Sequence, residues 1–210
     1  MRTLLVVAVL VCMTGVARAQ VEPSVYSEFS VEARHVGLLV HLDVGVDYLH
    51  SAASQNGTRL TLSGPGASAS LVIGGSVAEN WFLGADLWGS SAFTPTAGIA
   101  TILPQISGDQ TLGLYGLGFN VTHYIMPANL YFSFSPSVTV LSLDNPSQKT
   151  SASTNLGFGG RLVIGREWLV ARHIGLGVAA EAMVGVNPDK SGGPTWTTWG
   201  CAVVFSATFN

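Results

Sequence analysis

The sequence is poor in charged residues. Aspartate, glutamate, lysine and arginine make up 10% of its 210 residues, whereas hydrophobic residues make up 48%. A soluble domain usually carries about 25% charged residues. The low charge therefore argues against a soluble globular protein, and no basic patch indicates binding to nucleic acid.

Long hydrophobic runs are also missing. The apolar run Leu4–Met13 is too short to cross a bilayer as a helix, and no run of spanning length follows it. Helical membrane spans are thereby excluded. For a chain that is apolar and weakly charged, a closed transmembrane β-barrel is the common alternative, because it pairs all its backbone groups internally.

Cysteine is scarce, and one of the two residues lies in a leader. Arg2, the apolar run and Ala17-Arg18-Ala19 predict a secretory signal peptide at 1–19, cleaved after Ala19. Cleavage leaves seven basic and twelve acidic residues, with Cys201 alone, so no intrachain disulfide and no metal site is expected. Residues 20–35 are predicted to form a polar periplasmic lead-in.

What the sequence does contain is alternation. From Val36 to His50, apolar residues occupy every second position, and His41, Asp43 and Asp47 lie between them. A period of two indicates a β-strand with two unlike faces. An uncharged apolar face opposite an acidic one indicates lipid on one side and a polar interior on the other.

Seven further stretches alternate in the same way. Residues 36–210 are therefore predicted to form an all-β, eight-stranded antiparallel up-and-down transmembrane β-barrel. Its strands are expected at 36–50, 67–78, 81–91, 111–124, 130–143, 153–168, 173–186 and 195–209. The connections alternate between long and short, which is typical of long extracellular loops and short periplasmic turns, with both termini in the periplasm.

The competing interpretation is a soluble barrel or sandwich such as a lipocalin-like fold, which places its apolar face inside and a charged face outside. Here the other face is mostly Gly, Ser, Ala and Thr, which suits the interior of a narrow barrel better than a solvated exterior. Phe82 and Trp88 break the alternation of their strand and are expected in the lumen or at the rim.

The predicted inner face carries a small network of charges: Asp43, Asp86, Arg161 and Glu181. A buried arginine requires carboxylate partners, and the strand of Arg161 lies across the barrel from those of the two aspartates. The network is interpreted as a plug that seals the interior or, alternatively, as a switchable salt-bridge gate. His41 is expected beside it as a lumen residue.

Aromatic residues near strand ends are typical of the girdles at the two membrane interfaces. Trp81, Tyr124 and Trp168 are expected at the periplasmic interface, and Tyr48 and Trp199 at the other. Ordinary packing is the alternative for any one of them. His50, Asp47, Ser90 and Ser91 are expected near the outer rim, but they lie on separate strands and fix no spacing between a nucleophile and a base.

Three segments carry a resemblance: the turn from Val77 to Gly84, the segment 165–170 and the tail Val203–Phe209. In these the chain resembles the small eight-stranded outer-membrane β-barrels of Gram-negative bacteria, of the OmpW/OmpA-barrel type. The resemblance implies a location in the cell outer membrane, contact with outer-membrane lipid and insertion by the barrel-assembly machinery. It also implies that Phe205 and Phe209 belong to the assembly signal, although Asn210 follows Phe209.

The expected function is that of a non-enzymatic outer-membrane barrel with a structural or interaction role through its extracellular loops. No cofactor, metal or nucleic acid is expected, and no motif names a ligand. One alternative is a narrow conduit for small or hydrophobic solutes, as the OmpW resemblance implies. The other is a lipid-modifying outer-membrane enzyme.

Overall fold

The computed structural model describes residues 37–99, 110–145, 147–171 and 173–209. The predicted signal peptide at 1–19 and the predicted lead-in at 20–35 lie outside the described residues. Within the described part of the chain, no helix is long and apolar enough to cross a membrane.

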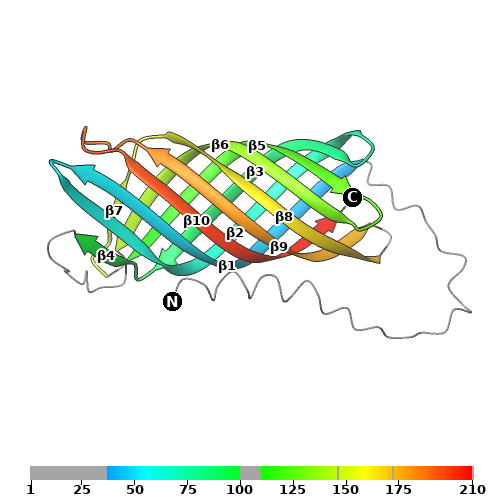
Figure 1. Ribbon diagram of the computed structural model, residues 1–210, viewed down its shortest axis with the longest axis horizontal. Coiled ribbons are helices and arrows are strands. Elements are labelled where there is room, and N and C mark those ends of the chain that lie inside the picture. The colour runs from blue at the N-terminus through cyan, green and yellow to red at the C-terminus, as the bar shows by residue number, and fades with distance from the viewer. Residues whose placement is uncertain (1–36, 100–109, 146, 172, 210) are drawn as a thin grey trace, which may run out of the picture. The chain divides into compact units, whose positions relative to one another are not determined.

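Ten strands make up the described structure, and eight of them close into a barrel (Figure 1). The eight barrel strands are β1 (Leu38–Gln55), β2 (Thr58–Ala78), β3 (Trp81–Phe93), β5 (Thr111–Ile125), β6 (Leu130–Asn145), β8 (Gly157–Ala171), β9 (Ile174–Asn187) and β10 (Trp196–Phe209). Each pairs antiparallel with the next in this order, and β1 pairs with β10 to close the ring. The predicted all-β, eight-stranded, up-and-down barrel is confirmed.

Two short strands extend the wall at one end. β4 (Thr96–Ile99) pairs with β2, and β7 (Thr150–Ser153) pairs with β6. This end also carries the connections β1–β2, β3–β5, β6–β8 and β9–β10, and is called the loop end below. The opposite end, where β2–β3, β5–β6 and β8–β9 connect, is called the turn end.

The prediction was wrong about residues 51–66, which were expected to form a loop. They continue β1 and β2 as one long hairpin, paired without interruption from Leu38↔Gly75 to Gln55↔Thr58. Asn56 and Gly57 form its two-residue turn, with φ of 51° and 79°. Positive φ at both central residues is typical of the type I′ turn that hairpins favour.

The strand expected at 153–168 is also divided differently. Residues 150–153 belong to β7, and β8 begins only at Gly157. Asn155 is exposed in the connection between these strands, where its backbone N–H donates to the carbonyl oxygen of Pro188. The segment around it therefore belongs to the loop-end structure rather than to the barrel wall.

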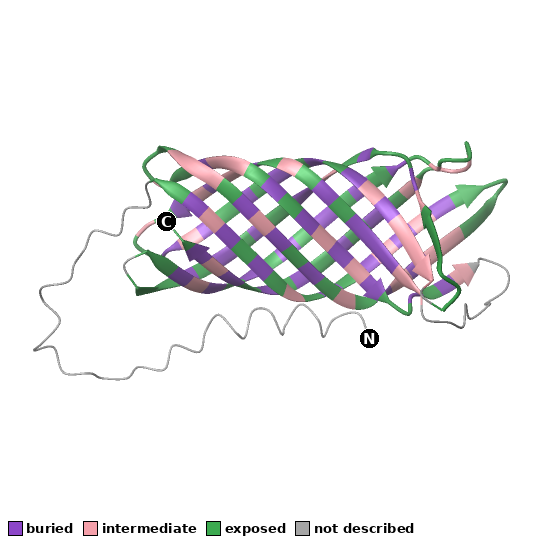
Figure 2. Ribbon diagram, turned by 180° about the vertical axis from the view of Figure 1, so that it is seen from behind, coloured by how far each residue is buried: buried purple, intermediate pink, exposed green. Residues whose placement is uncertain are grey.

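Burial alternates along the barrel strands, so that buried and exposed residues form a chequered wall (Figure 2). The exposed face of the wall is largely apolar, and the buried face of its central part is largely polar. This is the reverse of a soluble protein and is typical of a transmembrane barrel. Among the exposed residues of the outer face are Leu42, Val44, Val46, Leu87, Leu117, Phe119, Phe134, Leu162, Val178 and Val203.

Candidate functional site

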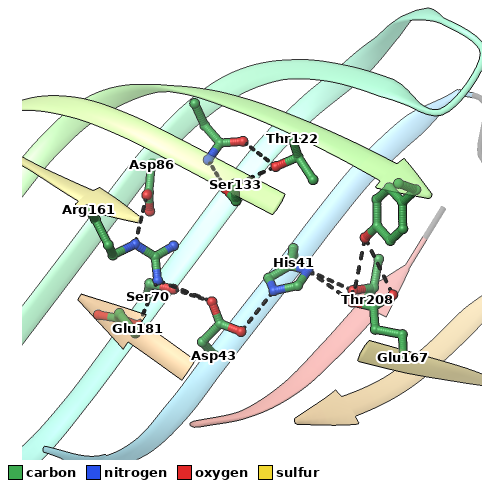
Figure 3. Close-up of polar contacts among 12 residues, drawn as sticks. His41, Asp43, Ser70, Asp86, Thr122, Ser133, Arg161, Glu167, Glu181 and Thr208 are labelled. Carbon is green, nitrogen blue, oxygen red and sulfur yellow. Dashed lines mark hydrogen bonds and ion pairs between the residues drawn. The ribbon is translucent and has the colours of Figure 1, made fainter. Parts of the chain in front are cut away.

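The central lumen is organised around the side chain of Arg161 on β8, which is 1% exposed. Its Nη1 atom lies 3.2 Å from Oδ2 of Asp43 on β1 and 3.0 Å from Oε2 of Glu181 on β9. Its Nε atom lies 3.1 Å from Oδ2 of Asp86 on β3. The structure thus brings together all four residues of the charge network expected from the sequence, from four strands (Figure 3).

Hydroxyl groups complete the shell around these carboxylates. Ser70 donates to Oδ2 of Asp43 at 2.9 Å, and Ser135 donates to Oδ2 of Asp86 at 2.6 Å. Asn120 donates through its Nδ2 to both Ser133 and Ser135. Buried polar groups must find such partners inside the protein. The small polar residues of the inner face therefore supply the hydrogen bonds that water would otherwise make to the charged groups.

A second cluster adjoins the first through His41, whose ring lies between two carboxylates. Its Nε2 atom is 2.8 Å from Oδ1 of Asp43, and its Nδ1 atom is 3.3 Å from Oε1 of Glu167. Thr208 lies 2.7 Å from Nδ1 and also donates to Glu167 (Figure 3). Each ring nitrogen therefore has an oxygen partner within hydrogen-bond distance.

Negative groups outnumber positive groups in this lumen. Four carboxylates, those of Asp43, Asp86, Glu167 and Glu181, contact one guanidinium and one imidazole. The basic groups are therefore the scarce partners, and each contacts more than one carboxylate. Losing a cation would leave buried anions uncompensated, which costs more than losing one carboxylate.

Large side chains fill the space on both sides of the network. Phe82, Tyr124 and Tyr131 are buried in the lumen, with the ring centroids of Tyr124 and Tyr131 5.6 Å apart. Trp88 is buried as well and donates its indole N–H to Ser137 at 2.9 Å. Phe82 and Trp88 were expected in the lumen or at the rim, and both side chains lie in the lumen.

Two glycines make room for these rings. A Cβ on Gly116 would lie 2.3 Å from the indole of Trp88, and one on Gly165 would lie 2.5 Å from the ring of Tyr131. Both distances are far below a normal contact, so the inner wall is thinned where an aromatic side chain lies across it. The space left beside His41, Asp43 and Arg161 is too narrow for a water molecule.

The girdle predictions divide between the two faces. Trp81, Trp168, Tyr48 and Trp199 lie on the outer face and are 42–50% exposed. Tyr124 does not, and its assignment to a girdle is corrected: it is 1% exposed and its hydroxyl donates to Glu167. Tyr124 lies two and four residues from Thr122 and Asn120, so alternation along β5 places all three on the inner face. Its position near the end of the strand does not change this orientation.

The outer aromatic residues have neighbours suited to an interface. Trp81 stacks on His123 with centroids 4.2 Å apart, and the Arg166 guanidinium lies 5.5 Å from the centre of the Trp168 ring. At the other end, Trp199 lies against Tyr48 and His50. Phe205 and Phe209, assigned to the assembly signal, both lie exposed on the outer face of β10.

The rim residues considered for catalysis do not form a reactive group. Asp47 accepts a hydrogen bond from Ser90, whereas His50 lies on the outer face against Trp199. Deeper in the lumen, Thr208, His41 and Asp43 follow one another like a hydroxyl, base and acid, but Thr208 is 3% exposed and has no room beside it for a substrate. Among the described residues, no group of three or more His, Cys, Asp and Glu side chains could hold a metal ion.

The outer wall has a shallow hollow of about 640 Å³ in the lipid-facing zone, around Pro136. The β5–β6 ladder pairs Gly118 with Ser137 and Val121 with Phe134, and is interrupted between these pairs. Proline cannot donate to a ladder, which explains the interruption. Behind the hollow, Ser137 contacts Trp88, so the hollow ends on the filled lumen.

Comparison with known proteins identifies the architecture. No family model matches the sequence, and no curated protein matches it. Among solved structures, Neisserial surface protein A (NspA) is 14% identical, with a TM-score of 0.51 over 80% of this chain and 96% of that chain. The outer membrane protein OprG from Pseudomonas aeruginosa is 13% identical (TM-score 0.47; 84% and 98% covered), and Ail of Yersinia pestis is 12% identical (TM-score 0.36; 82% and 99% covered).

The fold is therefore that of the small outer-membrane β-barrels of Gram-negative bacteria, as the resemblance in the sequence predicted. The apolar outer face agrees with the predicted location in the outer membrane. At this level of identity the likeness concerns the fold alone.

Proposed function

We propose that this protein is a non-enzymatic outer-membrane barrel that is sealed through its middle and acts through its loop end, on the outside of the cell. The observation that carries the proposal is the Arg161 network. It draws carboxylates from three other strands to one guanidinium, and Arg161, Asp43 and Asp86 are 0–1% exposed. An eight-stranded barrel is just wide enough for its own side chains to fill it.

The loop end supports the second half of the proposal. The β1–β2 hairpin extends to Asn56 and Gly57, and β4 and β7 brace the wall at the same end. By contrast, the turn end connects its strands by short turns. A rigid polar projection on one side of a membrane is suited to recognition rather than to passage of solutes.

Conductance in planar bilayers tests the seal. We expect the parent protein to add no current to that of the lipid alone, because no water-filled path crosses the network. Arg161→Ala distinguishes a plug from a gate. A plug leaves the trace closed because Trp88, Phe82, Tyr124 and Tyr131 still fill the lumen, whereas discrete openings in the parent or the variant would contradict the proposal.

The hollow at Pro136 favours a second candidate function, lateral passage of a small apolar solute between lipid and lumen. The interrupted ladder and the hollow of about 640 Å³ both lie there. Uptake of a hydrophobic tracer by liposomes tests it, with Pro136→Val as the variant that restores a ladder donor. Uptake equal to that of empty liposomes would exclude this candidate, and uptake that Pro136→Val abolishes would favour it over the sealed barrel.

A further inference from the structure

The two faces of the wall exchange character at the loop end. In the central barrel the inner face is polar, but beyond Gly64 and Gly113 it becomes leucine-rich, with Leu62, Leu112 and Leu141 only 1–4% exposed. The outer faces of β2 and β6 change in the opposite sense, to Thr61, Ser63, Ser142 and Asp144, which are all half-buried. An apolar interior with a polar exterior is the pattern of a barrel in water. The loop end therefore has the pattern of a small water-soluble cup standing on the transmembrane barrel.

This cup contains a cavity of about 180 Å³. β2, β5 and β6 supply its apolar wall, β7 and β10 complete it, and Asp189 from the β9–β10 connection reaches its edge. The apolar lining consists of Leu60, Leu62, Leu112, Leu141, Leu143, Ala152 and Trp196. An enclosed apolar cavity of about 150 Å³ binds a benzene-sized molecule, and this cavity has a similar volume but is open at one side. The cavity is thus of the size for one ring or a short alkyl chain.

The cup has a closed floor. Leu49, Leu114 and Met183 are 0–1% exposed and belong to the same apolar cluster as the leucines of the cavity. Leu49 and Met183 both approach within about 3 Å of the position a Cβ would take on Gly200. Below them lie Trp88 and the Arg161 network, so the cavity is a dead end rather than the mouth of a conduit.

A cleft of about 610 Å³ with a mixed polar and apolar lining adjoins the cavity and shares Leu60, Asp189 and Trp196 with it. Gln55, Asn56, Thr58 and Ser191 also line this cleft. A molecule with an apolar part in the cavity would therefore place its polar part among amides, hydroxyls and a carboxylate. Pockets that combine an apolar lining with a few polar groups are the usual form of small-molecule sites.

The β9–β10 connection at this edge is held in place. Lys190 donates to Ser153 on β7 at 2.6 Å, and Asn155 donates through Nδ2 to the carbonyl oxygen of Asp189 at 3.3 Å. Hydrogen bonds from the hydroxyl and backbone N–H of Ser191 keep the pKa of the Asp189 carboxyl below its usual value. The edge of the site is thus preformed and carries an ionised carboxylate at neutral pH.

We propose that the loop-end cup is a binding site for a small amphipathic molecule. The single ring or short alkyl chain of this molecule lies among the leucines, and its hydrogen-bonding group lies in the adjoining cleft. The inference goes beyond the proposed function, since it gives the loop end a ligand class. It shares with that function only the closed floor of the cup.

The test uses 4-fluorobenzyl alcohol as the probe and the full barrel in lipid nanodiscs, observed by fluorine NMR. We expect a saturable shift or broadening of the fluorine signal that nanodiscs of lipid alone do not produce. Leu143→Trp fills the cavity from a half-buried position and should weaken binding at least tenfold. Leu42→Trp makes the same change on the lipid-facing wall, where Leu42 is 46% exposed and lies away from the hollow at Pro136, and should leave binding unchanged.

Circular dichroism verifies that each variant folds, and Leu60→Trp, from a second half-buried position, replaces Leu143→Trp if that variant does not. A signal equal to that of empty nanodiscs, or equal binding by the cavity variant and the wall variant, would overturn the proposed site. Conductance measures the seal independently. Loss of the probe signal with a closed trace would refute the cup alone, and an open trace would refute the sealed barrel alone.

Discussion

Arg161 is the residue on which the lumen depends, because it is one of two basic groups that face four buried carboxylates. Replacing it with Met keeps much of its length but leaves Asp43, Asp86 and Glu181 without their common partner. Removing one member of a buried ionic group typically costs about 3–5 kcal/mol. We expect Arg161→Met to lower the free energy of unfolding by about that amount, measured by urea titration in lipid vesicles with tryptophan fluorescence.

Glu181→Gln is the matched control for this prediction. It removes one of the four carboxylates and keeps the shape of the side chain. Its amide oxygen can still accept from Arg161 at the position of Oε2, which lies 3.0 Å from Nη1 in the parent protein. We expect it to cost less than half as much as Arg161→Met. Equal costs for the two variants would show that the surplus of negative charge has no energetic consequence.

The sequence predicted correctly the lumen residues that were assigned to the inner face by their alternation along a strand. It missed Glu167, to which the alternation was not applied. Asp43, Asp86, Arg161 and Glu181 were assigned to the inner face by alternation, and they lie together there. Glu167 has the parity of Arg161 and could have been assigned in the same way. Its contacts with His41 and Thr208 could not, because the distance across a lumen depends on tilt and stagger, which alternation does not report.

The β1–β2 hairpin is the element that sequence reasoning described least well. Its outer half is rich in Ser, Thr, Asn and Gly, which suggested a loop, yet Asn56-Gly57 is the strongest short-range signal for a hairpin turn. Leu60 and Leu62 also alternate with polar residues. The alternation continues through this segment, but its apolar residues face the interior and its polar residues face outward. A prediction that expects every apolar stripe to face lipid therefore does not identify this segment as a strand.

The turn of this hairpin allows a prediction. Gly57 has φ of +79° and no atom within 4 Å of the position of a Cβ, so an added methyl group meets only the conformational cost, about 1–2 kcal/mol. We expect Gly57→Ala to speed hydrogen exchange of the outer hairpin, residues 51–62, several-fold. Because this end projects beyond the barrel, the free energy of global unfolding should change little.

Ser54→Ala is the control, since it adds no strain at an exposed position of the same hairpin. Its exchange should match that of the parent. If Gly57→Ala also exchanged like the parent, the tight turn at Asn56 and Gly57 would not hold the hairpin, and the interpretation of residues 51–66 as a loop would regain support.

On the scale of the whole molecule, the closed ring of eight strands followed from the sequence because a period of two, an even number of strands and alternating connection lengths all agree. The cup at the loop end did not. Whether a leucine faces lipid or an interior depends on where the membrane ends, and Tyr48 and Trp199 indicate that level only once the register Tyr48↔Cys201 and His50↔Trp199 is known. The boundary between the lipid-facing wall and the loop-end cup is thus set by the assembled barrel and not by any one strand.

That boundary can be located with one substitution made twice on β1. Val44 and Ala52 both point outward, Val44 being 53% exposed beside Phe205 and Ala69, and Ala52 lying between Thr61 and Thr197. Arginine on the lipid-facing wall costs about 2–4 kcal/mol near the midplane of the bilayer and about 0–1 kcal/mol near its edge. We therefore expect Val44→Arg to make folding into lipid vesicles less favourable by about 2–4 kcal/mol, and Ala52→Arg to fold almost as well as the parent.

Equal penalties at the two positions would place the loop end within the lipid and remove the basis for a water-exposed cup. No penalty at Val44 would mean that the assignment of the outer face is wrong.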